Sequence, residues 1–197
     1  MFKKFSISGR DRKKKSNGKN EEQQFLVEAI DLLENGHTFD ALQKLRILAK
    51  VVPNHPLVHL LMGRAFIEVG LFESAIDSLH KHLQIDPNSL EAMLYLGIAY
   101  YECGELNLAL ERFEMATKLR EDSVLARENL ALALLAAGKN EEALEELSKA
   151  HEEIPNDRNI VHLIVLALGR LGRWEEAKKY MLSKADSTST GVGVSEA

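Results

Sequence analysis

Residues 90–123, LEAMLYLGIAYYECGELNLALERFEMATKLREDS, decide the fold, because a helical pattern lies on each side of Gly104. On both sides small and large apolar residues recur at the spacing of one helix face: Met93, Leu96, Gly97 and Tyr100 before the glycine, and Ala109, Phe113 and Ala116 after it. The stretch therefore predicts two helices joined by a tight turn.

Three residue types, glycine, alanine and proline, recur along the chain every 34 residues. Glycine does so at Gly36, Gly70, Gly104, Gly138 and Gly172. Alanine follows five residues later each time, at Ala41, Ala75, Ala109, Ala143 and Ala177. Proline keeps the step at Pro53, Pro87 and Pro155, with Glu121 in the remaining place. Three columns that share one period indicate a tandem repeat of helical hairpins.

Each column has a physical role in such a hairpin. A glycine after a helix enters the left-handed region without steric cost and lets the chain reverse. The small alanine lies near the start of the second helix, where the two helices come closest. The proline ends the second helix, because it lacks the N–H donor that the next turn needs.

This pattern resembles the tetratricopeptide repeat, a helix–turn–helix unit of about 34 residues. The resemblance covers residues 22–184 as five units starting near 22, 56, 90, 124 and 158, of which the second to fourth fit best. It implies an all-α fold, a right-handed α-solenoid of tandem hairpins. The expected helix pairs are 22–35 with 38–51, 56–69 with 72–85, 90–103 with 106–119, 124–137 with 140–153, and 158–171 with 174–184. Residues 1–21 and 185–197 are expected to be disordered tails.

Composition and charge restrict the class of protein. Apolar residues make up 45% of the chain, which is enough for a packed core. The net charge of −5 divides unevenly: residues 1–20 hold eight Lys and Arg against one Asp, a charge of +7, which leaves −12 for the rest. An acidic body argues against nucleic-acid binding by the folded part. The single cysteine, Cys103, and the absence of a long apolar stretch or a secretory signal lead us to expect a cytoplasmic protein.

Catalytic, cofactor and metal motifs are not found. No phosphate-binding glycine loop occurs, and His80 and His82 point to different faces of a helix. His55 and His59 have the spacing of metal ligands, but Pro56 places His55 before the helix, so the pair is interpreted as structural. We expect no enzyme, no cofactor and no metal site.

The resemblance implies that the first helix of each unit lines a concave groove that receives a partner. The predicted groove residues in the first two units are Leu26, Ile30, Glu34, Leu57, Leu60, Arg64, Ile67 and Glu68, and those in the next two are Leu94, Ile98, Tyr101, Glu102 and Leu132. In some relatives a clamp of Lys, Asn and Arg grips a terminal carboxylate. The corresponding positions here hold apolar residues such as Leu26, Ile30 and Leu57, so a carboxylate clamp is disfavoured.

These positions instead form an apolar stripe edged by Glu34, Glu68 and Glu102, which keep the step of the glycine column. An exposed stripe of this size predicts a protein or peptide partner, namely an apolar segment or an amphipathic helix whose basic side chains meet the glutamates. Leu94→Glu is then expected to weaken binding without loss of helicity. The alternative interpretations are that several of these leucines complete the core, that the glutamates are ordinary solvated charges, or that the groove holds the protein's own tail or a second copy.

The basic tail 1–20 has its own alternatives. Phe2, Phe5 and Ile7 among the lysines are typical of a contact with an anionic membrane, and Arg10–Lys15 is also typical of a localisation signal or a nucleic-acid patch. A solvated tail without a partner is the third possibility.

For the whole chain the sequence predicts a protein-interaction scaffold or adaptor. The alternatives are a self-assembling structural protein, and therefore a homo-oligomer, or a chaperone of a secreted or membrane-associated client.

Overall fold

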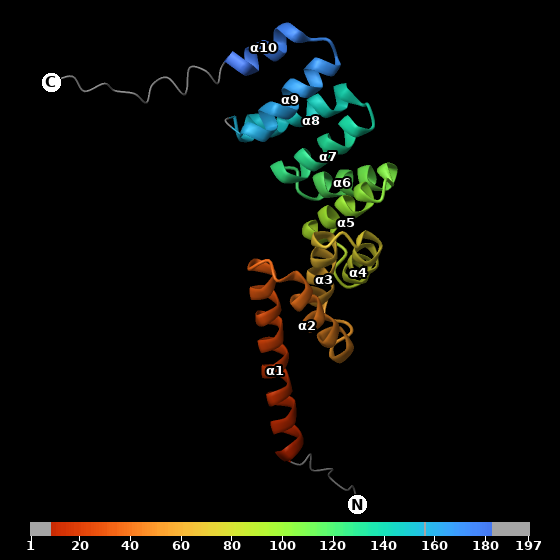
Figure 1. The fold of residues 1–197 in the computed structure, drawn as a ribbon, viewed down its shortest axis with the longest axis vertical. Coiled ribbons are helices and arrows are strands. Elements are labelled where there is room, and N and C mark those ends of the chain that lie inside the picture. The colour runs from red at the N-terminus through yellow and green to blue at the C-terminus, as the bar shows by residue number, and fades with distance from the viewer. Residues whose placement is uncertain (1–8, 156, 183–197) are drawn as a thin grey trace, which may run out of the picture. The chain divides into compact units, whose positions relative to one another are not determined.

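A computed structural model describes residues 9–155 and 157–182, and describes side chains from residue 21 onward. Within those residues all regular structure is helical, in ten helices that follow one another as hairpins (Figure 1). Their bounds are α1 Gly9–Glu34, α2 Thr38–Val51, α3 Pro56–Glu68, α4 Phe72–Ile85, α5 Leu90–Glu102, α6 Leu106–Leu119, α7 Val124–Ala136, α8 Asn140–Glu153, α9 Arg158–Arg170 and α10 Trp174–Leu182. The predicted all-α class of tandem helix pairs is confirmed.

The turns within the hairpins depend on the periodic glycines. All five have positive φ, between 72° and 80°, and they are the only described residues that do. At the first turn the N–H of His37 donates to the carbonyl of Leu32 at 2.8 Å, and that of Gly36 donates to the carbonyl of Leu33 at 3.1 Å. This pattern satisfies carbonyls that the end of α1 leaves without a helical partner.

The periodic alanines mark the contact between paired helices. Ala41, Ala75, Ala109 and Ala143 have no exposed surface, and Ala177 is 3% exposed. Two glycines of the first helices bring the backbone closer still. A Cβ at Gly63 would lie 2.5 Å from Cγ of Leu79, and one at Gly97 would lie 2.5 Å from Cε1 of Phe113. The side chains of Leu79 and Phe113 therefore occupy the space that the missing Cβ atoms leave.

The chain divides into two compact units, residues 1–95 and 96–197, and the boundary falls within α5. In the first unit the largest fully buried side chains are Leu45, Val58 and Leu79. In the second they are Leu96, Leu147, Ile160, Ile164 and Leu168. Both units thus contain fully buried apolar side chains, and the single stack of repeats over residues 22–184 stays a prediction.

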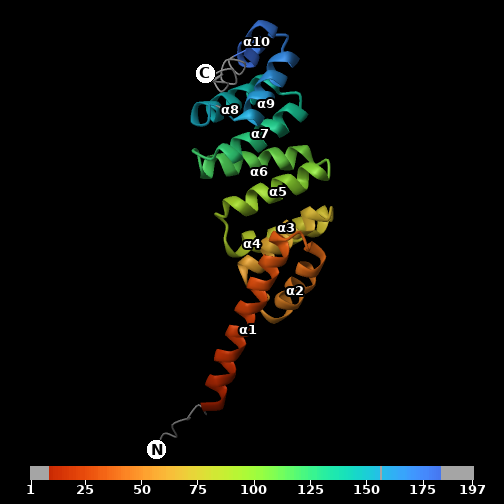
Figure 2. The same cartoon turned by 60° about the vertical axis from the view of Figure 1, so that its left-hand side comes forward.

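The start of the first helix differs from the prediction. Helix α1 begins at Gly9, so residues 9–21 are helical where a disordered tail was expected (Figure 2). Lysine and arginine are strong helix formers, and no proline interrupts this segment. Residues 1–8 and the predicted tail 185–197 lie outside the described residues. No described helix combines the length and the apolar character that crossing a membrane requires.

Candidate functional site

The second unit contains a cavity of about 360 Å³ that opens between consecutive repeats. Its lining residues are Ile98, Tyr101 and Glu102 of α5, Phe113 of α6, and Asn129 and Leu132 of α7. The first helices of two adjacent repeats supply five of the six, since the period of the sequence brings equivalent positions to the same face. The structure thus brings together four predicted groove residues, Ile98, Tyr101, Glu102 and Leu132.

The chemistry of this cavity is mainly apolar. Phe113 is only 2% exposed and forms its floor, whereas Tyr101 and Leu132 are 41% and 43% exposed. Asn129 is already engaged, because its Nδ2 donates to the carbonyl of Leu125 at 2.8 Å. The exposed carboxylate of Glu102 is the one acidic group among the lining residues. The arrangement can accept an apolar side chain and a neighbouring positive charge.

One turn of α7 before Leu132 lies Glu128, which is half-buried. Burial raises the pKa of its carboxyl, and the charge of Asp157 raises it further. Residues four apart lie on the same helix face, so Glu128 and Leu132 share a side of α7. The second unit therefore holds a carboxylate whose charged form is destabilised until a positive group lies near it.

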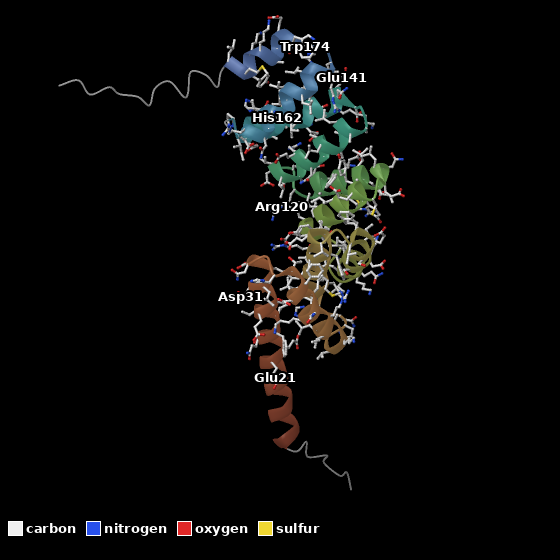
Figure 3. All side chains as sticks on the ribbon, viewed as in Figure 1. Glu21, Asp31, Arg120, Glu141, His162 and Trp174 are labelled. Carbon is white, nitrogen blue, oxygen red and sulfur yellow. The ribbon has the colours of Figure 1, made fainter. Side chains whose placement is uncertain are left out.

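A second cavity, of about 400 Å³, lies on the last hairpin. It is lined by His162, Val165, Leu166, Gly169 and Arg170 of α9 and Trp174 of α10. Figure 3 labels His162 and Trp174, on α9 and α10. The indole of Trp174 covers Gly169, where an added Cβ would lie 3.1 Å from Cζ3, yet the side chain is 63% exposed. The wall of this cavity is a large aromatic surface in contact with solvent.

Trp174 was not among the predicted site residues. The resemblance assigns the groove to the first helix of each unit, and Trp174 begins the second helix of the fifth unit. The signal that could have found it is the residue type, because this is the one tryptophan of the chain. Tryptophan is enriched in protein-binding surfaces.

In the first unit the predicted groove residues have mixed surroundings. Leu26, Ile30, Leu57 and Ile67 are half-buried, and Glu34 is exposed. The carboxylate of Glu68 already has partners within the protein. It accepts hydrogen bonds from Nε of Arg64 and from Oγ1 of Thr38, each at 2.9 Å. Burial lowers the pKa of Arg64, but the hydrogen bond to Glu68 and nearby negative charges outweigh it, and the pKa is raised. Arg64 and Glu68 therefore satisfy each other in the free protein.

Two predicted groove residues belong to the core instead. Leu60 is 8% exposed and Leu94 is 6% exposed, so the expectation that they form part of an exposed stripe is wrong. An internal repeat packs against neighbours on both sides, and a leucine at the edge of its open face can be covered by them. The substitution Leu94→Glu is consequently not a clean test of partner binding.

His59 and His82 each make a hydrogen bond to the backbone. His59 and His82 are buried; Nε2 of His59 lies 2.6 Å from the carbonyl oxygen of Pro53, and Nδ1 of His82 lies 2.9 Å from that of Pro56. Both contacts join a helix to the loop between α2 and α3 or to the residue that follows it. Among the described residues no group of three or more His, Cys, Asp or Glu is arranged to hold a metal ion.

Comparison with known proteins agrees with the repeat. The family model for the tetratricopeptide repeat matches residues 26–90 and 94–158. The chain belongs to the tetratricopeptide repeat family. No curated protein matches it by sequence. The family predicted from the periodic columns is thus confirmed.

Solved structures of the protein MamA have a similar fold to this tetratricopeptide protein. A crystal structure of MamA protein is 24% identical, with a TM-score of 0.78, and the match covers 89% of this chain and 98% of that one. A second MamA crystal structure is 26% identical, with a TM-score of 0.75, covering 82% and 96%. MamA 41-end from Desulfovibrio magneticus RS-1 is 20% identical, with a TM-score of 0.79, covering 87% and 97%. Stacked repeats of this kind form binding surfaces, so the fold is that of a protein-interaction scaffold.

Proposed function

We propose that this protein is a cytoplasmic scaffold or adaptor that binds an amphipathic helix or another apolar segment of a partner protein. The observation that carries the proposal is the cavity between α5 and α7, where Ile98, Tyr101 and Leu132 surround buried Phe113. Tyr101 and Leu132 are each about two-fifths exposed, so an apolar side chain that fills this cavity removes apolar surface from water, which favours binding.

The charge around this cavity indicates the polar half of the partner segment. Residues 96–197 hold 18 acidic and 12 basic residues, and Glu102 lies at the cavity itself. Glu128, one turn from Leu132, is a carboxyl whose pKa is raised by burial and by Asp157. A lysine or arginine beside Glu128 would stabilise its charged form. These features favour a basic amphipathic segment over an acidic one.

The variant Leu132→Gln tests this proposal. The substitution replaces an apolar side chain in the cavity wall by an amide of similar size. Full burial of a leucine contributes about 1.5–3 kcal/mol, so partner affinity should fall about tenfold or more. The matched control is Leu119→Gln on α6, because Leu119 is similarly exposed at 38% and does not line the cavity. The measurement is the amount of partner retained on each immobilised variant, with thermal unfolding to establish that both fold. Equal retention by the two variants would contradict the proposal.

Self-assembly is the second candidate function, and a different surface favours it. Phe39, Ile47 and Val51 on α2 are 72%, 53% and 68% exposed, and they lie along one face at multiples of four residues. Light scattering at increasing protein concentration separates the two functions, since an assembling protein grows in mass and an adaptor does not.

A chaperone for a secreted or membrane-associated client is a narrower form of the first proposal, in which the bound segment is the client's own apolar stretch.

A further inference from the structure

The two apolar cavities of the second unit are lined at equivalent positions of the repeat. The first lies between α5 and α7, and the second lies on the last hairpin. The equivalent residues are Ile98, Tyr101 and Glu102 in the first cavity and Leu166, Gly169 and Arg170 in the second. Each residue of the second set lies two repeats after its counterpart. Because equivalent positions of stacked repeats lie on one face, both cavities belong to the face formed by the first helices.

The charges at one of these equivalent positions are opposite. Glu102 is an exposed carboxylate on α5, and Arg170 is an exposed guanidinium on α9. The repeat between them has the uncharged Ala136 at this position. The face formed by the first helices of the second unit is therefore negative at α5 and positive at α9.

The positive charge of Arg170 is available to a ligand. Its Nη1 donates to the carbonyl of Leu135 on α7 at 2.5 Å, which fixes the side chain beside its cavity. No carboxylate of the described residues forms an ion pair with it, whereas Arg127, Lys149 and Arg173 of the same unit each pair with a glutamate. A guanidinium has five N–H donors, so Arg170 can bind an anion and keep its bond to α7.

The remaining walls of this cavity offer apolar surface. Leu132 of the following repeat contributes a wall of the first cavity, and the indole of Trp174 contributes a wall of the second. Trp174 is 63% exposed and Leu166 is 39% exposed, so a ligand can cover apolar surface on both. An apolar side chain beside a carboxylate matches this combination, because the indole and the leucine take the first and the guanidinium takes the second.

We propose that the cavity of the last hairpin is a second subsite, which binds an apolar side chain and a neighbouring carboxylate of the partner segment. This inference rests on the proposed function, in which the cavity between α5 and α7 takes the basic part of that segment. Together the two subsites bind the segment in one direction, with basic residues at Glu102 and acidic residues at Arg170. Like charges oppose the reversed arrangement.

The spacing of the repeats gives the length of the recognised segment. Helices α7 and α9 are in contact, and α5 and α7 share the first cavity. Packed helices lie about 8–10 Å apart, so two steps along this face cover about 16–20 Å. About 11–13 residues of helix span that distance, and residues about eleven apart lie on the same side of a helix. The segment therefore carries a basic and an acidic residue about three helical turns apart, each beside an apolar one.

The first test uses the full chain and two small probes of opposite charge, 3-phenylpropionate and 3-phenylpropylamine. Trp174 is the one tryptophan of the chain, so its fluorescence reports on the second cavity. The anion should shift that fluorescence at about a fivefold lower concentration than the cation, the factor that an exposed charge pair contributes at most. Arg170→Glu should reverse this preference. The matched control Arg158→Glu changes an exposed arginine of α9 that does not line the cavity and should keep it.

The second test measures the direction of binding with a synthetic helical peptide. The peptide has a lysine and a glutamate about eleven positions apart, with a leucine beside each. A nitroxide on its glutamate end should quench the fluorescence of Trp174, whereas a nitroxide on its lysine end should leave most of it. Leu132→Gln should weaken binding of the peptide about tenfold, as it does for the partner.

The outcomes separate the second subsite from the proposed function. Equal responses to the two small probes, or an unchanged preference in Arg170→Glu, would overturn the second subsite. Equal quenching from the two ends of the peptide would overturn the direction of binding. A peptide that does not bind, or that Leu132→Gln binds equally well, would contradict the proposed function, while the small probes would still report on the second subsite by itself.

Discussion

Leu94→Glu is expected to unfold the repeats around α5, with a loss of about 4 kcal/mol or more in the free energy of unfolding. Leu94 is 6% exposed, so the substitution removes a buried apolar side chain and places a carboxylate where water does not reach. Losing a buried leucine costs about 2–5 kcal/mol, and an unpaired buried polar group or charge adds further cost. Denaturant unfolding followed by circular dichroism measures the effect.

The control for this result is the same substitution on an exposed leucine. Leu125 is 58% exposed in the first turn of α7, where a carboxylate also favours the helix dipole. Leu125→Glu should therefore change the free energy of unfolding by less than about 1 kcal/mol. If Leu94→Glu were as stable as Leu125→Glu and yet lost the partner, Leu94 would be a groove residue and its assignment to the core would be wrong.

Gly97→Ala is expected to lower the free energy of unfolding by about 1 kcal/mol or somewhat more, although alanine is the better helix former. The new Cβ would lie 2.5 Å and 2.8 Å from Cε1 and Cδ1 of Phe113. Phe113 is 2% exposed, so its ring cannot leave the core. Overpacking a core costs about 1–3 kcal/mol, which exceeds the gain of up to about 1 kcal/mol in helix propensity. Thermal unfolding of the two proteins checks the sign.

A second substitution distinguishes this clash from a general effect of the mutation. One repeat later the equivalent positions hold Ala131 and Leu147, both fully buried, so a larger residue on the first helix is matched by a smaller one on the second. The double variant Gly97→Ala/Phe113→Leu recreates that pair and should be more stable than the sum of the two single changes predicts, by about 1 kcal/mol. Additive effects would contradict a direct contact between Gly97 and Phe113.

Much of the fold could be predicted from the sequence, because each hairpin carries its own boundary marks. The glycine column fixes where first helices end, and the predicted bounds of α2, α4, α6 and α8 agree with the structure to the residue. The predicted start of α1 at residue 22 was wrong, because the periodic columns begin only at Gly36, Ala41 and Pro53 and mark no helix start before them. Its charged residues are compatible with a helix as well as with a solvated tail, and spacing alone does not decide between them.

The candidate site could be predicted only in part. Ile98, Tyr101, Glu102 and Leu132 come together because equivalent positions of adjacent repeats lie on one face. The burial of Leu60 and Leu94 depends on the side chains that cover them, which a period does not report. The placement of the Trp174 indole over Gly169 is likewise a contact between side chain and backbone that the period does not report.

Photo-crosslinking at position 101 tests most directly whether the cavity between α5 and α7 holds an apolar segment of a partner. A benzophenone amino acid replaces Tyr101, an exposed aromatic residue of the cavity, and a second variant carries it at Leu119, which is similarly exposed but does not line the cavity. We expect position 101, and not position 119, to crosslink a partner protein, and mass spectrometry to place the crosslink in an amphipathic segment with basic residues. Crosslinks of equal yield at both positions, or a crosslink at position 101 to an acidic, polar segment, would contradict this account.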